Sequence, residues 1–272
     1  MSFRHLTYSV FLGFGAFLIA LWLSSRPSIP SEKSADGVVR IGTVNLGYRN
    51  AEPDAAARAL LQARPDVLIL QEWTGRNLAL TRLQKTGLKP VLSDERNGTH
   101  GSALLARSNL VLASRIAPSP WKGNCGMPLL TAQLRIGTKM VGLIAAHGPP
   151  PVSACWASRK PYLRSIVSLI KNGRLTQSVG VAPKGIPVLL AGDLNALAWE
   201  EPLRSISGRG LANAFDSGSW RLGPTWSPTW WSPALVTIDH IWLPTEAISN
   251  AAWTLLVPGS DHRAVLADIS FP

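Results

Sequence analysis

A carboxylate and a carboxamide stand two residues apart at the end of a short apolar run. The run 187–191 has the length and flanks of a buried strand, and Gly192, Asp193 and Asn195 follow it. Residues i and i+2 of an extended segment point the same way, so the two side chains face one point. The carboxylate suits a hard cation or a water proton, and the amide suits a phosphate oxygen. The alternative interpretation is an Asx turn that closes a strand.

Other polar residues occupy similar places in the chain. They come at or just after an apolar run, or interrupt one, or begin the last strand. They are Asn45, Glu72, His147, Asp239, Asp261 and His262. Each alone could be a turn former, a solvated loop residue, a cap or a buried structural acid. Their recurrence at strand ends, where open α/β sheets place their chemistry, predicts a shared site.

The elements that position these residues are many short strands and a few helices. The predicted strands cover 38–46, 67–70, 101–106, 110–114, 129–136, 140–146, 187–191, 237–243, 252–257 and 264–269. The predicted helices cover 53–63, 160–171 and a short segment at 202–206. Hairpin-like strands flanked by helices predict two mixed sheets with helices outside them.

Composition is consistent with a large globular domain that has an anionic partner. The chain has 272 residues, is 46% hydrophobic and carries a formal net charge of +11. A basic protein attracts nucleic acid, an anionic membrane surface or a phosphorylated substrate. The charges are scattered, and no basic tract typical of a nucleic-acid tail occurs. Simple solubility is the alternative explanation of the charge.

The N-terminal residues predict membrane targeting. Residues 8–23 form an uncharged apolar run, followed by a polar Ser/Pro-rich stretch. We expect a membrane anchor or signal segment over 1–25, a linker over 26–37 and a catalytic domain over 38–272. An uncleaved anchor is favoured over a cleaved signal peptide and over a buried helix, since the run is long and its cleavage pattern is poor. The domain is then expected outside the cytoplasm, in the periplasm or the extracellular space, and secreted if the segment is cleaved.

The two cysteines, Cys125 and Cys155, lie in loop-like sequence. In an exported protein they are expected to form a disulfide. The alternative is two unrelated free thiols. No histidine pair stands near them, so they do not predict a zinc site.

The order of the polar residues resembles the endonuclease/exonuclease/phosphatase superfamily, which includes deoxyribonucleases, AP endonucleases, inositol-polyphosphate phosphatases and neutral sphingomyelinases. The resemblance rests on the Gly-Asp-Leu-Asn motif at 192–195, the Ser-Asp-His motif at 260–262 and the strand sequence 101–107, and it extends from about residue 40 to residue 269. It implies a four-layer α/β/β/α sandwich of two mixed β-sheets flanked by helices, here with an N-terminal transmembrane or signal helix.

The resemblance also implies a metal and a phosphate site. Glu72 would bind Mg²⁺, with Mn²⁺ as the alternative ion, and Asp261 would lie near the same metal. Asn45 and Asn195 would orient the scissile phosphate. A hard, oxygen-ligated cation neutralises the charge that develops on phosphoryl oxygens, which explains the carboxylates.

The remaining roles implied by the resemblance concern protons. Asp193 would position or activate the attacking water, and His262 would be a general base or a phosphate ligand oriented by Asp239. His147 would hydrogen-bond the phosphate and assist the leaving group. Strand alternation places His240 on the face opposite to Asp239, so His240 is expected to be structural.

Two features bear on the substrate. AP endonucleases usually have a second metal-contacting acid two positions after the residue that corresponds to Asn45, and this chain lacks it. The loop 147–151, with Trp156 and Arg159 after it, resembles the exported, membrane-anchored bacterial branch of the superfamily. That branch includes proteins associated with glycopeptide-antibiotic resistance, for which a lipid-diphosphate phosphatase role has been proposed.

A tryptophan-rich segment, 220–231, is expected at the rim of the site. Its indoles could stack on bases, lie at a membrane interface, or simply pack on the domain. Three arginines are candidate phosphate contacts or surface charges: Arg107, Arg159 and Arg164.

Three functions follow from these features. The first is a Mg²⁺-dependent phosphoesterase that hydrolyses a phosphate mono- or diester, such as a lipid phosphate or diphosphate, at the membrane surface by in-line attack of water. The second is an extracytoplasmic or membrane-anchored nuclease acting on DNA or RNA. The third is a non-catalytic binding protein, which would have lost principal residues that this chain retains. No protein partner is inferred.

Overall fold

The computed structural model describes residues 37–123, 125–152, 154–171, 185–207, 210–216, 223–229 and 232–272. The predicted N-terminal anchor and almost all of the predicted linker lie outside these residues, and the domain boundaries remain a prediction. Within the described ranges, none of the helices combines the length and apolar character that crossing a bilayer requires.

The strands form two six-stranded mixed sheets. The first sheet has the order β11-β12-β1-β2-β4-β3. Its members are β11 (Ile248–Leu256), β12 (Arg263–Ser270), β1 (Val39–Asn45), β2 (Val67–Gln71), β4 (Ser102–Arg107) and β3 (Leu88–Asp94). The second sheet has the order β5-β6-β7-β8-β10-β9. Its members are β5 (Val111–Ala117), β6 (Leu129–Ile136), β7 (Lys139–Ala145), β8 (Val188–Asp193), β10 (Asp239–Pro244) and β9 (Leu211–Asn213).

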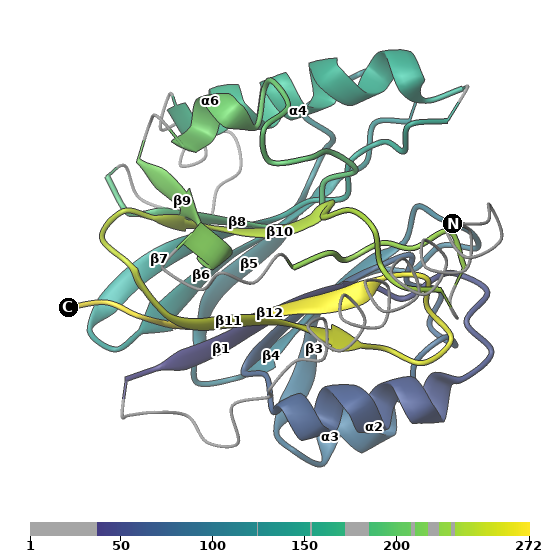
Figure 1. Cartoon of the computed structure of the whole chain (residues 1–272). Helices are drawn as coiled ribbons and strands as arrows, with labels where there is room; N and C mark the ends of the chain where they lie inside the picture. The colour runs from purple at the N-terminus through teal and green to yellow at the C-terminus, as the bar shows by residue number, and fades with distance from the viewer. Residues whose placement is uncertain are drawn as a thin grey trace, which may run out of the picture.

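Helices cover the outer face of each sheet, so the fold has four layers (Figure 1). α2 (Pro53–Ala63) and α3 (Leu80–Gln84) lie beside the first sheet, while α4 (Trp156–Lys171) and α6 (Arg204–Ser207) lie beside the second. A 3₁₀ turn, Ala214–Asp216, follows β9. The predicted α/β/β/α sandwich is confirmed.

Apolar residues on both faces of the strands produce this layering. Along β8, Leu189 belongs to the core between the sheets, whereas Leu190 belongs to the core under α4. In β2, Ile69 packs between the sheets and Leu70 packs under α2. Because successive strand residues point to opposite faces, an unbroken apolar run gives a strand that is covered on both sides.

Each sheet contains one central parallel pair, and these pairs set the position of the site. β1 runs parallel to β2, and β7 runs parallel to β8. Parallel strands end at the same edge of a sheet, so the residues that follow them gather there. Antiparallel neighbours, β12 beside β1 and β10 beside β8, begin at that same edge.

Several element boundaries differ from the predicted ones. The edge strand β3 was not predicted, because Pro90 interrupts its sequence, and its pairing shifts register next to that residue. The short α3 and β9 were also missed. β5 and β10 are displaced by one to three residues from the predicted strands, and β11 begins four residues earlier than predicted.

α4 begins at Trp156, four residues before the predicted start, and contains Pro161. Tertiary contacts fix its first turn. Arg159 donates through Nη1 to the carbonyl of Asn195 at 2.7 Å and pairs with Glu200 at 2.6 Å. These contacts are between residues far apart in sequence, so local pattern did not predict them.

The predicted disulfide between Cys125 and Cys155 is confirmed, with Cα atoms 5.6 Å apart. It ties the loop between β5 and β6 to the residue directly before α4. A cross-link over 30 residues restricts the unfolded chain and is worth about 3 kcal/mol.

Candidate active site

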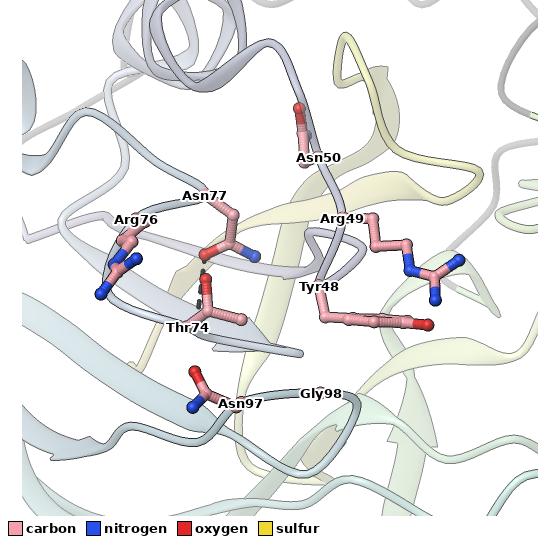
Figure 2. Close-up of a pocket in the computed structure, with 8 residues that line it drawn as sticks. All are labelled: Tyr48, Arg49, Asn50, Thr74, Arg76, Asn77, Asn97 and Gly98. Atoms are coloured by element: carbon pink, nitrogen blue, oxygen red, sulfur yellow. Dashed lines mark hydrogen bonds between the residues drawn. The ribbon is translucent and has the colours of Figure 1, made fainter.

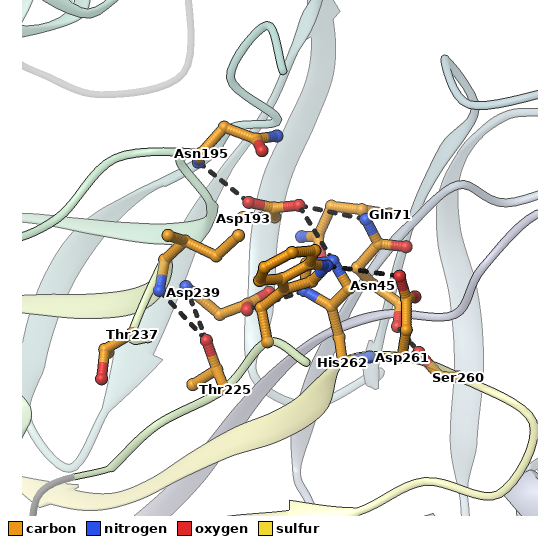
Figure 3. Close-up of polar contacts among 12 residues, drawn as sticks. Asn45, Gln71, Asp193, Asn195, Thr225, Thr237, Asp239, Ser260, Asp261 and His262 are labelled. Carbon is orange, nitrogen blue, oxygen red and sulfur yellow. Dashed lines mark hydrogen bonds and ion pairs between the residues drawn. The ribbon is translucent and has the colours of Figure 1, made fainter. Parts of the chain in front are cut away.

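Asp193 lies at the shared edge of the two sheets. It ends β8 and is fully buried. Its Oδ1 accepts the backbone N–H of Asn195 at 2.9 Å, and its Oδ2 accepts Nδ2 of Asn45 at 3.0 Å. Figure 3 shows Asp193 held between these two residues, one from each sheet.

Gly192 and Asn195 make this strand end possible. Gly192 has φ 146°, and a Cβ there would collide with the carbonyl of Ala146 on the neighbouring segment. Asn195 has φ 49°, a left-handed conformation that asparagine tolerates better than most residues. Its side chain donates to the carbonyl of Gly148 at 2.9 Å. The Gly-Asp-Leu-Asn motif is thus also a structural requirement of the turn.

Two histidines face the same oxygen of Asp193. The Nε2 atoms of His147 and His262 lie 3.7 Å and 3.8 Å from Oδ2 of Asp193. These separations are longer than a direct hydrogen bond, so an oxygen of water or phosphate could bridge the groups. Both imidazoles are buried.

The pair Asp239–His262 crosses from one sheet to the other. Nδ1 of His262, which directly precedes β12, lies 2.9 Å from Oδ2 of Asp239, the first residue of β10. The register places Asp239 directly opposite Asp193, where two carboxylates repel. The imidazole near both of them offsets that repulsion.

Two supporting residues, Thr225 and Ser260, were assigned no role from sequence. Oγ1 of Thr225 accepts the N–H groups of Ile238 and Asp239, both at 3.1 Å. Oγ of Ser260 donates to the carbonyl of Asn45 at 2.7 Å and accepts the N–H of His262 at 3.0 Å. The Ser-Asp-His motif signalled Ser260, whereas Thr225 carried no pattern of its own.

Glu72 lies at the more open side of the site. It follows β2 with φ 54°, which is strained for a glutamate and directs its carboxylate toward Asn45. Its Oε1 accepts Nδ2 of Asn45 at 3.3 Å, and its Oε2 accepts the N–H of Tyr48 at 2.8 Å. Asn45 therefore links Glu72 to Asp193.

Asp261 precedes His262 and is half-buried. Its Oδ2 accepts the indole N–H of Trp226 at 3.3 Å. Trp226 belongs to the predicted tryptophan-rich segment and is confirmed at the site. Trp220, Trp230 and Trp231 of that segment lie outside the described residues.

The environments of the two site histidines drive their pKa values in opposite directions. Burial lowers the pKa of His147 to about 4. Burial would also lower the pKa of His262, but Asp239 and Asp193 outweigh it and raise that pKa to about 10. At neutral pH, His147 is therefore neutral and His262 is an imidazolium.

Two carboxyls of the site, those of Asp193 and Glu72, have raised pKa values. Burial, together with the nearby Asp239, raises the pKa of Asp193. Burial likewise raises the pKa of Glu72, against the opposing hydrogen bonds from Tyr48 and Asn45. Raised carboxyl pKa values are typical of sites that transfer protons or hold cations.

Other predicted residues serve the framework. His240 is fully buried, with Nε2 2.8 Å from the carbonyl of Ala196 and Nδ1 3.1 Å from Nδ2 of Asn213. The expectation that it is structural is confirmed.

The three candidate arginines are all paired with carboxylates. They form the pairs Arg107–Asp66, Arg159–Glu200 and Arg164–Glu201. Arg159 is buried and paired with Glu200, so it is neither a surface charge nor a free phosphate contact.

The donor chemistry of the site fits a divalent cation. Asp193, Asp239 and His262 offer ligand atoms within 4.8 Å of one another. A carboxylate has about four acceptor sites. Glu72 accepts two hydrogen bonds and the side chain of Asp261 accepts one, so both have lone pairs left for a cation. Oxygen-rich groups of this kind suit hard cations.

Comparison with known proteins agrees with this geometry. The sequence profile of the Endonuclease/Exonuclease/phosphatase family matches residues 42–262. A search of curated proteins finds no match.

Solved structures of the same fold are found at low sequence identity. D. rerio TDP2 complexed with a single-strand DNA product has a TM-score of 0.66 and 18% identity, covering 86% of this chain and 100% of that one. The human Nocturnin catalytic domain with bound sulfate has a TM-score of 0.64 and 20% identity, covering 88% and 96%. A functionally unknown conserved protein from Enterococcus faecalis has a TM-score of 0.65 and 17% identity, covering 86% and 100%.

Proposed function

Because the chain belongs to the endonuclease/exonuclease/phosphatase family and is thereby a phosphoric ester hydrolase, we propose that it is a Mg²⁺-dependent phosphoesterase that attacks its substrate with water at Asp193. The observation that carries this proposal is the convergence on Oδ2 of Asp193. Asn45 Nδ2, His147 Nε2 and His262 Nε2 lie 3.0, 3.7 and 3.8 Å from it.

Asp193 is the group that orients the water and takes its proton. Asn45 and the N–H of Asn195 fix the carboxylate, so its orientation does not change during the reaction. Burial raises its pKa and thereby makes it a stronger base than a solvated aspartate.

His262 acts as a cationic phosphate ligand. Its pKa near 10 means that it enters the reaction already protonated, so it has no free lone pair with which to accept a proton. Asp239 fixes its Nδ1, which leaves its Nε2–H, 3.8 Å from Oδ2 of Asp193, available to donate to a phosphoryl oxygen. His147, with a pKa near 4, is neutral and donates a hydrogen bond to the phosphate or the leaving oxygen.

We assign the metal to Glu72 and Asp261 rather than to Asp193, Asp239 and His262. Nδ1 of His262 and Oδ2 of Asp239 already contact each other at 2.9 Å, which leaves this pair less free than Glu72 and Asp261 to hold a cation. When bound, the cation would neutralise charge that develops on the phosphoryl oxygens. Asn195 would orient the phosphate with its remaining amide N–H, whereas Asn45 acts on it indirectly by holding Asp193 and Glu72.

A phosphate ester at a membrane surface is the first candidate substrate, including a lipid phosphate or diphosphate. Residues 8–23 are apolar, and Trp156 and Trp199 expose 60% and 68% of their surface. Arg159 packs over the Trp156 ring at 5.5 Å and pairs with Glu200, the neighbour of Trp199. Exposed indoles near a site are typical of interfacial contact.

The proposed location is outside the cytoplasm, with the domain anchored through its N-terminal segment. The Cys125–Cys155 disulfide supports this, because such bonds persist in oxidising compartments.

Nucleic acid is the second candidate substrate. The net charge of +11 favours a polyanion, and D. rerio TDP2, which shares the fold, is complexed with single-strand DNA product. A nuclease would use the same water, metal and phosphate ligands.

One assay tests the proposal. The full chain in detergent is incubated with Mg²⁺ against supercoiled plasmid and against a polyprenyl diphosphate, with EDTA and Asp193→Asn as controls. Phosphate release from the lipid alone supports the membrane phosphoesterase. Plasmid nicking alone, lost in Asp193→Asn, supports the nuclease. Activity that survives both controls would contradict the proposed chemistry.

A further inference from the structure

The turn after β8 carries Asn195, and its backbone is held from two sides. Nη1 of Arg159, in the first turn of α4, donates to the carbonyl of Asn195 at 2.7 Å. The next carbonyl, that of Ala196, lies 2.8 Å from Nε2 of His240 on β10. Both side chains are buried, where a hydrogen bond is stronger than in water. Residues from two different elements therefore fix two successive carbonyls of this turn.

Glu200 orients the arginine and also binds the turn. Its Oε2 accepts Nη2 of Arg159 at 2.6 Å, and its Oε1 accepts Nη1 at 3.1 Å. The same Oε1 accepts the N–H of Leu197 at 2.9 Å. A bidentate pair fixes the plane of a guanidinium group, so Nη1 stays directed at the carbonyl of Asn195. We call Arg159 and Glu200 the clamp.

The helix that carries Arg159 is itself fixed at its start. Cys155 directly precedes α4 and forms the disulfide with Cys125. The N–H of Trp156 donates to the carbonyl of Val152 at 2.9 Å, and the guanidinium of Arg159 packs over the Trp156 ring at 5.5 Å. The arginine thus has little freedom to leave the turn.

Asn195 needs this support because its backbone conformation is unfavourable. Its φ of 49° is left-handed, a region that a Cβ disfavours. Its side chain donates one N–H to the carbonyl of Gly148 at 2.9 Å, and the other N–H is the one that the proposed function assigns to the phosphate. Relaxation of the backbone would move this side chain and that N–H with it.

We propose that Arg159, oriented by Glu200, is a positioning residue of the active site, which holds Asn195 in the conformation that presents its amide N–H to the phosphate. The inference rests on the proposed function for the role of Asn195. It assigns Arg159 a contribution to the reaction although its guanidinium is committed to Asn195 and Glu200.

The same helix offers a matched control. Arg164 pairs with Glu201 at 2.9 Å, so it also links α4 to the segment that follows Asn195. Both side chains of this pair are exposed, and the hydrogen bonds of Arg164 go to Glu201 and not to the turn. A change common to Arg159→Gln and Arg164→Gln would come from a looser helix, whereas a change confined to Arg159→Gln comes from the turn.

NMR spectroscopy of the full chain in detergent, with isotope-labelled asparagine, tests the position of the Asn195 amide without substrate. Its signals are identified by their loss in Asn195→Gly, which the left-handed backbone tolerates. Arg159→Gln is expected to shift and broaden them, and Arg164→Gln is expected to leave them unchanged.

Glu200→Ala should produce the same shift, and it decides the test if Arg159→Gln does not fold, since Glu200 is partly exposed. Unchanged Asn195 signals in the clamp variants would overturn the inference, as would an equal change in Arg164→Gln.

Hydrolysis of bis(p-nitrophenyl) phosphate with Mg²⁺ tests the consequence for the reaction. Arg159→Gln is expected to lower kcat/KM about tenfold, the effect of one hydrogen bond to a charged group, while Arg164→Gln stays within about twofold of the wild type. In the Asn195→Gly background, Arg159→Gln should cost nothing further, because its effect passes through the asparagine. A tenfold loss in both backgrounds would contradict the proposal.

The two experiments separate this inference from the proposed function. If the wild type fails to hydrolyse the ester while the Asn195 signals respond only to the clamp variants, Arg159 positions Asn195 and the proposed reaction is wrong. If hydrolysis requires Mg²⁺ and Asp193 but the signals do not respond, the proposed function stands and the positioning role of Arg159 is wrong.

Discussion

The two sheets contribute unequal halves to the site. The acids next to the second sheet, Asp193 and Asp239, are fully buried. The acids contributed by the first sheet, Glu72 and Asp261, are only half-buried, and Glu72 adjoins an open pocket beside Tyr48 (Figure 2). Both halves are built in the same way, from the end of a parallel pair and the start of an antiparallel neighbour.

The difference in burial separates two kinds of chemistry. A dry carboxylate has a strong preference for a proton or a fixed cationic partner, so the second sheet suits proton transfer. A carboxylate near solvent can exchange a hydrated ion, so the first sheet suits a metal and the substrate that arrives with it. His262 from the first sheet, bound to Asp239 of the second, couples the two halves.

The largest expected effect is at Asp193, one of the fully buried acids of the second sheet. Asp193→Asn keeps the shape of the side chain but removes the base, so kcat should fall about 10³-fold while the Mg²⁺ concentration for half-maximal activity changes little. Steady-state kinetics with a Mg²⁺ titration measures both. If the variant lost Mg²⁺ affinity instead, the metal would bind at the buried acids of the second sheet, and the assignment of different roles to the two sheets would be wrong.

The next effect is a pH dependence of stability from His262. Its folded pKa of about 10 exceeds the ordinary value of 6.5, so its contribution is fully present below pH 6.5 and is lost as pH rises through 10. The loss should be on the order of 5 kcal/mol in urea unfolding with EDTA, and His262→Asn should flatten it.

His147 should make stability fall at acid pH, opposite to the effect of His262. Its folded pKa of about 4 lies below 6.5, so its contribution is present above pH 6.5 and is lost as pH falls through 4. His147→Asn should reduce the loss of stability at acid pH by about 3 kcal/mol without changing the loss at alkaline pH. Equal slopes in the wild type and both variants would show that neither imidazole has a folded pKa that differs from its unfolded value.

A moderate effect is expected at the open half. Glu72→Gln should weaken Mg²⁺ binding by at least about tenfold, and much of the lost kcat should return at high Mg²⁺. Calorimetric titration with Mg²⁺ measures the affinity directly. If kcat stays low at saturating metal, Glu72 acts in the chemical step and not only on the cation.

The smallest effect concerns the indole that binds Asp261. Trp226→Phe keeps the ring but removes the hydrogen bond at 3.3 Å, so Mg²⁺ affinity should fall about two- to fivefold at unchanged kcat. Trp199→Phe, an exposed position, serves as the matched control. An equal effect from both would assign the change to general loss of indole area.

Much of the site was predictable because its residues follow recognisable strands. Asn45, Glu72, His147 and Asp193 could be placed from apolar runs alone, since such runs end where the polar residues begin. Asp239 was identifiable because a carboxylate inside an apolar strand must have a partner. Its partner, His262, lies 23 residues away and was identified only through the family resemblance.

Other features were not predictable from local pattern. β3 contains a proline and lies at a sheet edge, and the first turn of α4 depends on Arg159 reaching Glu200 and Asn195. The open pocket beside Tyr48 is lined by three separate segments, none of which has a distinctive sequence.

The amino-acid sequence by itself determined the strands, the residue types at their ends and the chance of a disulfide, because periodicity, polarity and cysteine content are local properties. Only the tertiary structure decided which carboxylates are dry, which histidine is charged and which arginine holds the turn that carries Asn195. Those properties depend on burial and on distances between residues far apart in the chain. Neither can be known until the two sheets pack together.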